Sequence, residues 1–242
     1  MSLYLAAPML ASPESINLPN GLMAYWELES DSTDSVGSSD GTDTGITYAA
    51  AKVNNGATGF NGSADKITIG TTTAIKPTTA MSISAWIKRE ASGEHRILSV
   101  GWENYPTALS GFQLLLSSGA QPTLSIGNDT GYTVGTHVGS CVHGSGTSLS
   151  TWAHVVGTWD GSTIKVYLNG GAPASIAWTG GCAYNATVRA GLGYSHTTVF
   201  GGDSHRYLTG DLDEVGLWNR ALNATEVAAL YNGGSGRAYA NF

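Results

Sequence analysis

Short apolar segments, in which apolar and polar residues partly alternate, recur along almost the whole chain. Each segment is bounded by Gly, Asn, Asp, Ser or Pro, the residues that most often form turns. This pattern predicts β-strands that follow one another directly and are joined by tight turns. The predicted strands are 21–28, 66–70, 81–89, 96–101, 112–118, 122–128, 152–160, 163–170, 174–180, 187–193 and 210–218.

Many short strands with no helix between them predict an all-β fold, in which two antiparallel sheets face each other as a sandwich or jelly roll. Asp160-Gly161 separates two predicted strands and favours a tight hairpin, because this dipeptide tolerates a positive φ. The stretch "LNGG", residues 168–171, predicts a second turn of the same kind.

The segment "NATEVAALYNGG" is the one helix that the sequence predicts. Asn223 is placed to cap its start together with Glu226 three residues later, and Gly233 is placed to end it. The chain has no internal repeat, charged linker or break in composition. We therefore predict a single domain over residues 21–242, with one short C-terminal helix on an edge of the sandwich.

The first twenty residues are expected to form an extended N-terminal arm. The opening "MSLYLAAPMLASP" contains small and apolar residues, as a signal peptide does, but it lacks a basic start and Pro8 interrupts its apolar centre. We therefore interpret residues 1–20 as an arm held by another surface rather than as a secretion signal.

Charged residues make up 12% of the 242 residues, well below the usual share of about 25%. The formal net charge is −7, and the 11 Lys and Arg residues never cluster, which argues against a nucleic-acid partner or an anionic membrane surface. The sequence contains no apolar run long enough to cross a bilayer, so membrane insertion is not expected.

Cys141 and Cys182 are the two cysteines, and both lie in Gly-rich segments. Neither has a second Cys beside it, so a thiolate metal site is not expected. The favoured interpretation is one disulfide between the two loops, which would stabilise the fold by about 3–4 kcal/mol. The alternative is a pair of buried free thiols in a reducing compartment.

The stretch "GDLDEVGLW", residues 210–218, places three carboxylates directly before a run of apolar residues. In a regular strand Asp213 shares its face with Val215 and Leu217, so this acid is expected to point toward the core. Burying an unpaired carboxylate costs roughly several kcal/mol. Asp213 is therefore expected to have a partner, a proton or a metal.

Several segments, in order along the chain, resemble the laminin G-like, concanavalin A-like jelly-roll family. The resemblance extends over roughly residues 21–232 and implies the same two-sheet sandwich. The long polar stretch 102–147 and the first twenty residues depart from it, so features specific to this protein are expected there. The matching segments are "AYWELESDSTDSVGSSDGT" (24–42), "NNGATGFNGSADKITIG" (54–70), "MSISAWIKR" (81–89) with "TWAHVVGTWDGSTIKVYLNGG" (151–171), and "LTGDLDEVGLWNRALNATEVAALYN" (208–232).

Members of this family often carry a structural calcium ion, and the resemblance implies that Asp34 and Asp213 supply its side-chain ligands. Loops rich in Asp, Ser and Gly offer the carboxylate and carbonyl oxygens that calcium prefers. A calcium ion would also neutralise an inward-facing Asp213. The alternative is that Asp213 accepts hydrogen bonds from backbone N–H groups or caps a turn.

Hydrolases of the laminarinase type share this sandwich, so the resemblance allows an enzymatic function as well as a binding function. A retaining glycosidase needs two carboxyl groups about 5–5.5 Å apart. Glu27 and Glu29 alternate suitably along one strand, but the central predicted strands lack the Glu-x-Asp-x-x-Glu motif of those hydrolases. We therefore expect no catalytic activity.

Aromatic residues in loops are the remaining candidates for a binding site. Trp102, Tyr105, Tyr132 and Tyr194 lie in predicted loops beside Asn, Asp and Gly, a setting that suits stacking on sugars or anchoring of a protein partner. The alternative is that these rings fold over the ends of the sandwich. The favoured hypothesis is a non-catalytic recognition or adhesion module that binds glycan or protein and is displayed outside a cell or on a particle.

Two other functions stay open. A structural protein of a virion, such as a decoration or fibre-associated subunit, is suggested by the termini that have no counterpart in the family and suit docking in a homo-oligomer or particle. A glycoside hydrolase is disfavoured, because the central predicted strands do not carry the expected pair of carboxylates.

Overall fold

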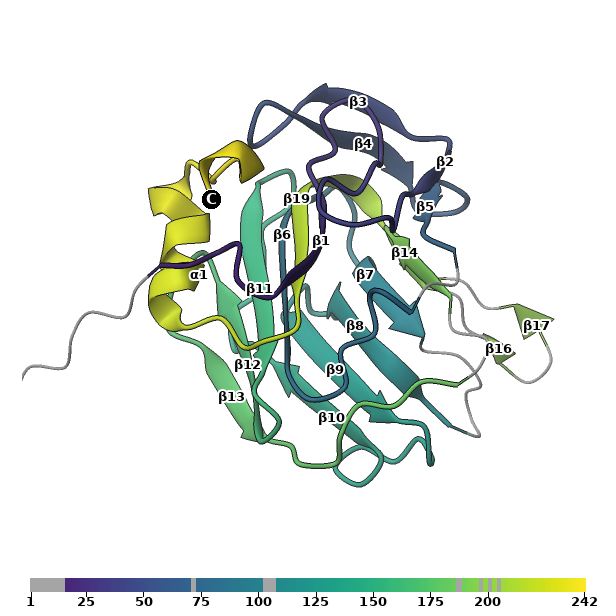
Figure 1. Cartoon of the computed structure of the whole chain (residues 1–242). Helices are drawn as coiled ribbons and strands as arrows, with labels where there is room; N and C mark the ends of the chain where they lie inside the picture. Colours follow the sequence, from purple (N-terminus) through teal and green to yellow (C-terminus); the bar gives the residue numbers. More distant parts are fainter. Residues whose placement is uncertain are drawn as a thin grey trace, which may run out of the picture.

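The chain folds into two large antiparallel sheets packed face to face (Figure 1). This computed structural model describes residues 16–70, 73–101, 108–185, 189–195, 198–199, 202–203 and 206–242. The predicted all-β sandwich with one short C-terminal helix is confirmed.

The first sheet contains, in spatial order, β13 (Ala174–Ala177), β12 (Thr163–Leu168), β11 (Ala153–Trp159), β6 (Met81–Arg89), β19 (Thr209–Trp218), β4 (Asn55–Asn61) and β3 (Thr47–Ala50), with β1 (Leu22–Trp26) also paired to β19. The second sheet contains β10 (Val138–Val142), β9 (Pro122–Asn128), β8 (Ser110–Leu116), β7 (His95–Gly101), β14 (Ala190–Leu192), β5 (Lys66–Thr68) and β2 (Thr42–Thr44). Two short pairs lie outside these sheets: β15 (Tyr194–Ser195) with β18 (Arg206–Tyr207), and β16 (Thr198–Val199) with β17 (Gly202–Asp203).

Every predicted strand has a counterpart among the strands of the two sheets. The predicted hairpin at Asp160-Gly161 joins β11 and β12, with Gly161 at a φ of 91° and the Asp160 carboxylate accepting hydrogen bonds from the backbone N–H groups of Ser162 and Thr163. The sequence did not predict β2, β3, β4 and β10. The strands β2 and β3 are mostly exposed and therefore lack the alternation of apolar residues that marks a half-buried strand.

Apolar side chains from both sheets fill the space between them and form one continuous core. Three fully or almost fully buried tryptophans each satisfy their indole N–H with a backbone carbonyl: Trp26 with Ser39, Trp159 with Trp178, and Trp218 with Leu18. These bonds matter because a buried donor without a partner costs about 1–3 kcal/mol. The pairs also fix loops and the described end of the N-terminal arm to the sheets.

Helix α1 (Ala224–Tyr231) lies on the outer face of the first sheet. The predicted capping box is confirmed: the Asn223 side chain accepts the Glu226 N–H, and the Glu226 carboxylate accepts the Asn223 N–H. The helix ends one residue earlier than predicted, at Asn232 with a φ of 49°, because asparagine also adopts the left-handed conformation. No helix in the described part of the chain is long and apolar enough to span a membrane.

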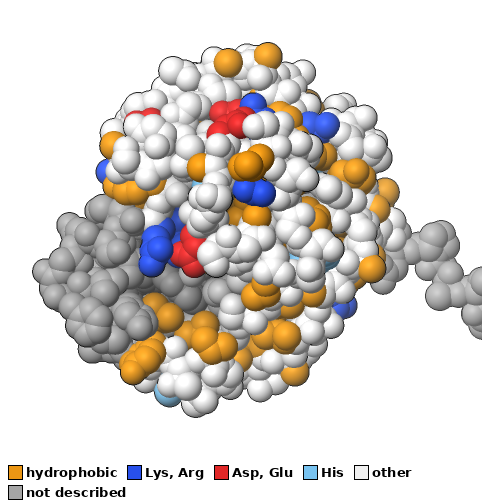
Figure 2. Space-filling model, turned by 180° about the vertical axis from the view of Figure 1, so that it is seen from behind, with side chains coloured by type: hydrophobic (Ala, Val, Ile, Leu, Met, Phe, Trp, Pro, Cys, Tyr) orange, Lys and Arg blue, Asp and Glu red, His pale blue; other side chains and the backbone are white. Residues whose placement is uncertain are grey.

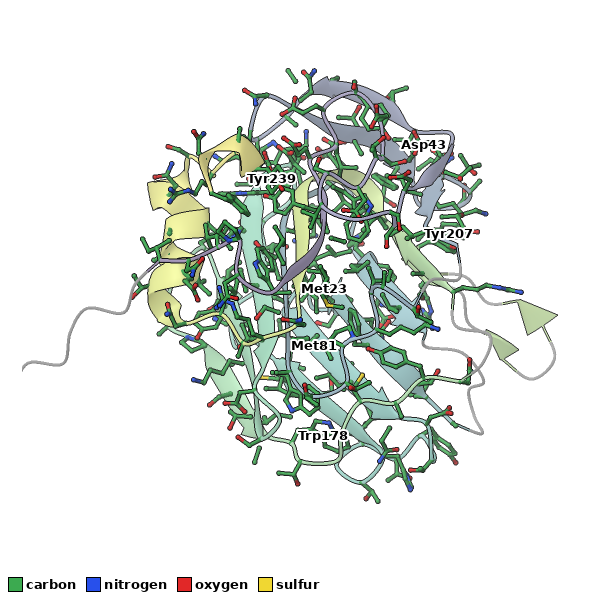
Figure 3. The ribbon with its side chains drawn as sticks, in the orientation of Figure 1. Met23, Asp43, Met81, Trp178, Tyr207 and Tyr239 are labelled. Atoms are coloured by element: carbon green, nitrogen blue, oxygen red, sulfur yellow. The ribbon has the colours of Figure 1, made fainter. Side chains whose placement is uncertain are left out.

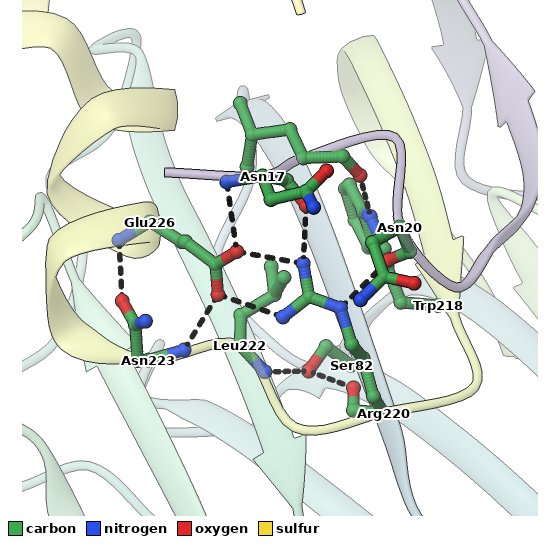
Figure 4. A network of polar contacts seen from close by, with 9 residues as sticks. Asn17, Asn20, Ser82, Trp218, Arg220, Leu222, Asn223 and Glu226 are labelled. Atoms are coloured by element: carbon green, nitrogen blue, oxygen red, sulfur yellow. Dashed lines mark hydrogen bonds and ion pairs between the residues drawn. The ribbon is translucent and has the colours of Figure 1, made fainter. Parts of the chain in front are cut away.

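Residues 16–20, the described part of the predicted arm, are packed onto the domain. Leu18 is 1% exposed within a second apolar cluster that also contains Tyr25, Trp218 and residues of α1. Figure 4 shows how Arg220 bridges this segment to the helix, through the carbonyls of Asn17 and Asn20 and the carboxylate of Glu226. Residues 1–15 lie outside the described residues.

Charged side chains are few and scattered on the rear face of the molecule, with single Lys or Arg groups beside acidic ones (Figure 2). This distribution agrees with the low charged fraction of the sequence. The view shows no extended basic surface of the kind that binds nucleic acid.

Candidate functional site

A β-bulge in β19 controls the direction of Asp213. The pairing of β19 with β6 shifts between Asp213 and Gly216, and Glu214 has a φ of 50°. Leu212 and Val215 therefore both point into the core. Asp213 instead pairs with Trp86 on the outer face of the sheet, so the predicted inward direction of this acid is wrong.

Asp213 is nevertheless fully buried, because the turn between β3 and β4 covers it. One carboxylate oxygen, Oδ2, accepts the backbone N–H groups of Lys52 at 3.0 Å and of Val53 at 2.7 Å. Burial raises the pKa of Asp213 to about 8, although these two N–H groups oppose the rise. The partner of Asp213 is thus the backbone of a turn, which is the alternative given by the sequence, and the raised pKa indicates that this acid is mainly protonated at neutral pH.

Glu214 is a second buried acid at the bulge, with 3% of its surface exposed. Burial raises its pKa to about 8 and is the larger effect, although its carboxylate lies beside the Tyr25 hydroxyl, which opposes this rise. Asp213 and Glu214 are therefore closed to solvent and are mainly protonated at neutral pH.

Asp34 is also buried, and both oxygens of its carboxylate accept hydrogen bonds from backbone N–H groups of its own loop and of β1. One oxygen accepts the N–H groups of Tyr25 and Val36 at 3.0 and 3.1 Å, and the other accepts the N–H of Ser39 at 3.0 Å. Backbone N–H groups carry partial positive charge, so they occupy the positions at which a cation would have to bind.

Asp34 thus does not fit the role of a calcium ligand, and Asp213 offers a single oxygen without a partner. The described residues contain no group of three or more His, Cys, Asp and Glu side chains that could hold a metal ion. Calcium requires about six to eight oxygen ligands. The calcium ion remains a prediction from the sequence. The geometry favours the alternative given for Asp213, in which this acid accepts backbone N–H groups, and Asp34 does the same.

The loop aromatics that the sequence predicted as a binding surface do not form one cluster. Trp102 and Tyr105 lie outside the described residues. Tyr194 is 5% exposed and pairs with Tyr207 through a ring stack between β15 and β18, so it folds onto the sandwich. Tyr132 is 49% exposed and lies at the surface.

Both cysteines are buried free thiols, so the disulfide predicted between Cys141 and Cys182 is absent. Burial raises the pKa of both thiols, to about 12 for Cys182. Both side chains belong to the core between the sheets. They therefore act as small apolar groups there, the alternative that the sequence had left open.

A polar cavity of about 440 Å³ lies where the β3–β4 turn meets the segment that follows α1. Figure 1 shows this turn reaching toward the C-terminal segment, although the two are far apart in the sequence. The volume falls within the range of about 300–1,000 Å³ that is usual for small-molecule sites. Four polar side chains line the cavity, with Val53 and Ala238 as apolar neighbours: Asn54, Asn232, Arg237 and Asn241.

The turn that forms one wall is fixed by carboxylates on its far side. Asp213 binds the N–H groups of residues 52 and 53, as described above. Glu29 accepts the side-chain amide of Asn54 at 2.9 Å and the backbone N–H of Asn55 at 3.0 Å. Asn54 itself has a φ of 55°, a left-handed conformation that asparagine tolerates. These bonds hold Asn54 in place before any ligand arrives.

The C-terminal wall is held by aromatic packing and by one glycine. Tyr239 stacks on Tyr25 with 5.1 Å between ring centroids, and the Phe242 ring meets Tyr25 edge-on at 5.0 Å. Gly236 is buried with a φ of 78°, and a Cβ at this position would come within 2.4 Å of the Val53 side chain. Only glycine therefore allows the two walls to approach each other this closely.

Sequence reasoning missed this cavity, since nothing in the spacing of its residues marks it. Val53 and Asn54 lie about 180 residues before Asn232 and Arg237 in the chain. Single Asn and Arg residues in loops are common, and only the topology of the sandwich brings these together. The two-Asn turn at residues 54–55 is the one local signal, and it indicates a turn rather than a site.

A smaller cavity of about 230 Å³ lies between residues 135–136 and residues 177–180. Trp178 is 5% exposed; positions 139 and 180, on its two sides, are glycines whose added Cβ would collide with the ring. Its indole N–H donates to the Gly181 carbonyl at 3.0 Å. The ring is therefore a structural element and offers no open face to a sugar. Figure 3 places Trp178 at the opposite end of the molecule from Tyr239, so the two cavities are distant from each other.

The outer face of the second sheet carries a row of polar side chains. The strand register aligns Ser99, Gln113, Ser125 and Ser140 across β7 to β10. The hydroxyl of Ser99 and the amide oxygen of Gln113 lack partners among the residues described. The first three side chains are 5% exposed or less, so this row is closed to a ligand in the structure.

Comparisons with solved structures show proteins of the same fold. Domain 4 of AbnA, an extracellular arabinanase from Geobacillus stearothermophilus solved with arabinotriose, is 19% identical, with a TM-score of 0.61 over 86% of this chain and 97% of that domain. The binding domain of Paraclostridial Mosquitocidal Protein 1 is also 19% identical, with a TM-score of 0.66 over 89% of this chain and 53% of that one. A Trypanosoma rangeli sialidase is 16% identical, with a TM-score of 0.56 over 87% of this chain and 32% of that one.

The chain thus spans about half of the toxin binding domain and a third of the sialidase. A search of curated protein sequences finds no match. A family model described as the concanavalin A-like lectin/glucanases superfamily matches residues 60–228, more than half of the chain. Together with the two-sheet architecture, this match shows that the chain belongs to the concanavalin A-like lectin/glucanase superfamily.

Proposed function

We propose that this protein is a non-catalytic recognition module, displayed outside a cell, that binds a glycan in the cavity between the β3–β4 turn and the C-terminal segment. The observation that carries the proposal is the lining of this cavity by three amides and one guanidinium group on two rigid walls. Amide groups both donate and accept hydrogen bonds, which matches the hydroxyl groups of a sugar. The neighbouring Val53 and Ala238 offer apolar contact to the C–H groups of a sugar ring.

The fold neighbours support this choice without deciding it. One is a domain solved with arabinotriose, and another is named as the binding domain of a toxin. The arabinanase and the sialidase are enzymes as whole proteins, but the likeness covers one domain of the first and about a third of the second, so it does not decide between binding and hydrolysis.

The positions of the acids favour binding over hydrolysis. A glycosidase needs two carboxyl groups that reach the scissile bond. Asp213 and Glu214 are at most 3% exposed, and both carboxylate oxygens of Glu29 already accept hydrogen bonds from the turn. None of the described residues that line the cavity is an Asp or a Glu. A hydrolase would therefore have to work with groups outside this cavity.

A glycan array probed with the labelled full chain tests the proposal. We expect binding to a subset of glycans that is reduced at least tenfold in the Asn241→Ala variant, which loses hydrogen bonds to the sugar. We expect the same of Asn232→Ala, which also loses the bond from its amide to the Gly236 carbonyl that shapes the wall. Thr136→Ala, which lines the smaller cavity, is the matched control and should bind normally. Absence of binding to any glycan, or equal losses in all three variants, would contradict the proposal. Release of reducing sugars by the unaltered chain would instead identify a hydrolase.

A protein partner is the second candidate, and one observation favours it. Val134 is 68% exposed and Tyr132 49% exposed in the loop before β10, and Ile176 of β13 is 36% exposed. Exposed apolar groups at one end of a sandwich suit contact with a protein, including other copies in a particle. Light scattering of the full chain checks this: we expect a monomer, and an oligomer that Val134→Asp dissociates would favour the assembled-subunit function.

A further inference from the structure

Two cationic side chains at the polar cavity lack an acidic partner within the described residues. Arg237 lines the cavity, and its one hydrogen bond runs from Nε to the carbonyl oxygen of Asn241 at 2.8 Å. Its two terminal nitrogens are therefore available. Lys52 directly precedes the cavity residue Val53, and its Nζ lies 4.7 Å above the centre of the Trp86 ring without an ion pair.

Ion pairs hold some cations of the molecule but not others. Lys88 pairs with Asp211 at 2.7 Å, Arg220 pairs with Glu226 at 2.6 Å, and Arg206 pairs with Glu94 at 3.3 Å. Arg89 has no acidic partner among the described residues, and its guanidinium group donates to the carbonyls of Ala91 and Thr147 instead. Within the described part of the chain, the terminal nitrogens of Arg237 have neither kind of acceptor, and Arg237 lines a cavity of ligand size.

The acids near the cavity do not supply that partner. Glu29 lies behind the turn, where Asn54 and Asn55 take up both of its carboxylate oxygens. Asp213 lies beneath the same turn and is bound to its backbone. Neither residue lines the cavity. The Arg237 guanidinium therefore faces a space bordered by amides and apolar groups.

We infer that the cavity selects an acidic sugar, one whose ring carries a carboxylate, with Arg237 as the residue that recognises this group. The terminal nitrogens of an arginine form a fork that matches the two oxygens of a carboxylate. Asn54, Asn232 and Asn241 would then bind the hydroxyl groups of the same ring. This inference rests on the proposed glycan-binding function and names the class of its ligand.

Lys52 has a different role in this inference. It is placed beside the cavity over Trp86 rather than among the residues that line it. Its charge would attract the ligand over a distance of roughly 5–10 Å, an interaction that salt weakens. Arg237 would contact the ligand directly, so the effect of changing Arg237 should depend less on salt.

Matched pairs of neutral and acidic oligosaccharides test the inference by calorimetric titration of the full chain. One arm compares lactose with sialyllactose, and another compares trigalactose with trigalacturonate. We expect at least one acidic member to bind tenfold or more tightly than its neutral partner. The arm in which this preference occurs tells whether the carboxylate belongs to a nonulosonic acid or to a uronic acid.

Three variants complete the test. Arg237→Gln should remove the preference for the acidic sugar while weak binding of the neutral one persists, and Arg237→Lys should restore only part of it, since a lysine lacks the fork. Lys165→Ala removes one positive charge from β12, outside the cavity, and should leave the preference unchanged. Thermal unfolding of each variant confirms that it is folded.

The outcomes separate the two proposals. Equal binding of neutral and acidic sugars would overturn the inference but leave the glycan-binding function intact. A preference that Lys165→Ala reduces as much as Arg237→Gln would also overturn it, because the effect would then come from net charge alone. Absence of binding in every arm and on a broad array would contradict the proposed function itself.

Discussion

At the scale of single residues, the bulge in β19 explains why two acids can be buried side by side. Glu214 adopts a left-handed backbone conformation, which costs a non-glycine residue about 1–2 kcal/mol. The extra residue turns Asp213 away from the core and toward the backbone of the turn that closes over it. The backbone strain at Glu214 thus lies next to Asp213, the residue whose carboxylate ties the β3–β4 turn to the first sheet.

The raised pKa values of Asp213 and Glu214 predict that stability falls as the pH rises from 5 to 8. In the unfolded chain both acids lose their protons near pH 4, whereas burial holds both pKa values at about 8 in the folded protein. Above pH 4 the ionisation of these acids therefore lowers the free energy of the unfolded state, whereas in the folded state both acids stay protonated until about pH 8. Each acid contributes about 1.36 kcal/mol per pH unit between its two pKa values, so we expect a loss on the order of 3–4 kcal/mol for each acid from pH 5 to 8, measured by urea unfolding at pH 5, 6.5 and 8.

Asp213→Asn is the control for this pH dependence. Its amide oxygen can still accept the N–H groups of the turn, but the side chain does not titrate. We expect the variant to lose less stability between pH 5 and 8 than the unaltered chain. An equal slope in both proteins would show that Asp213 does not titrate as its burial indicates.

Asp34 gives a second prediction at this scale, because its carboxylate serves three backbone N–H groups. Asp34→Ala should lower the free energy of unfolding by about 2–4 kcal/mol, since those buried donors lose their acceptor. Asp34→Asn retains one acceptor and should cost less. Because N–H groups rather than a cation satisfy this acid, EDTA should leave the melting temperature unchanged. A melting temperature that rises by several degrees with added calcium would restore the predicted ion.

At the scale of elements, α1 is held by an ion pair rather than by its own propensity, since eight residues are too few for a stable isolated helix. Glu226 is 2% exposed, and Arg220 contacts both of its oxygens at 2.6 and 2.8 Å. Although burial acts to raise it, Arg220 holds the pKa of Glu226 below its usual range.

Arg220→Ala should therefore lower the free energy of unfolding by about 2–4 kcal/mol, because it leaves a buried carboxylate with too few donors and releases the carbonyls of residues 17 and 20. Chemical unfolding measures this loss. Asn223→Ala removes only the cap and should cost about 0.5–2 kcal/mol. The prediction fails if the Arg220 variant is no less stable than the Asn223 variant.

The strands also show which parts of the structure can be predicted from the sequence. Strands such as β6 and β19 were predicted because apolar residues that face the core partly alternate with polar ones, although both faces of these strands are buried in the structure. The exposed β2 and β3 carry no such pattern. The bulge at Glu214 was missed, since a two-residue alternation cannot reveal an extra residue. The cavity was missed for a larger reason: Asn54 and Arg237 meet only through the strand order of the first sheet.

At the scale of the whole molecule, the cavity depends on how the C-terminal segment is fastened to the first strand. Residues 232–241 form one wall but belong to no sheet. Their attachment is the packing of Tyr239 and Phe242 on Tyr25, a residue of β1 that belongs to the apolar cluster beneath α1. If the cavity is the proposed binding site, we therefore expect binding and stability to be coupled through rings that do not line it.

Tyr239→Ala tests this coupling. The substitution removes the ring stacked on Tyr25, so we expect a loss of about 2–3 kcal/mol in stability and a loss of glycan binding of tenfold or more, although Tyr239 does not line the cavity. Leu149→Ala, at a side chain that is 50% exposed, is the control and should change neither quantity. Chemical unfolding and calorimetric titration measure the two effects. If the variant is destabilised but binds glycan as tightly as the unaltered chain, the C-terminal segment does not form a wall of the binding site, and the cavity has to be sought elsewhere on the sandwich.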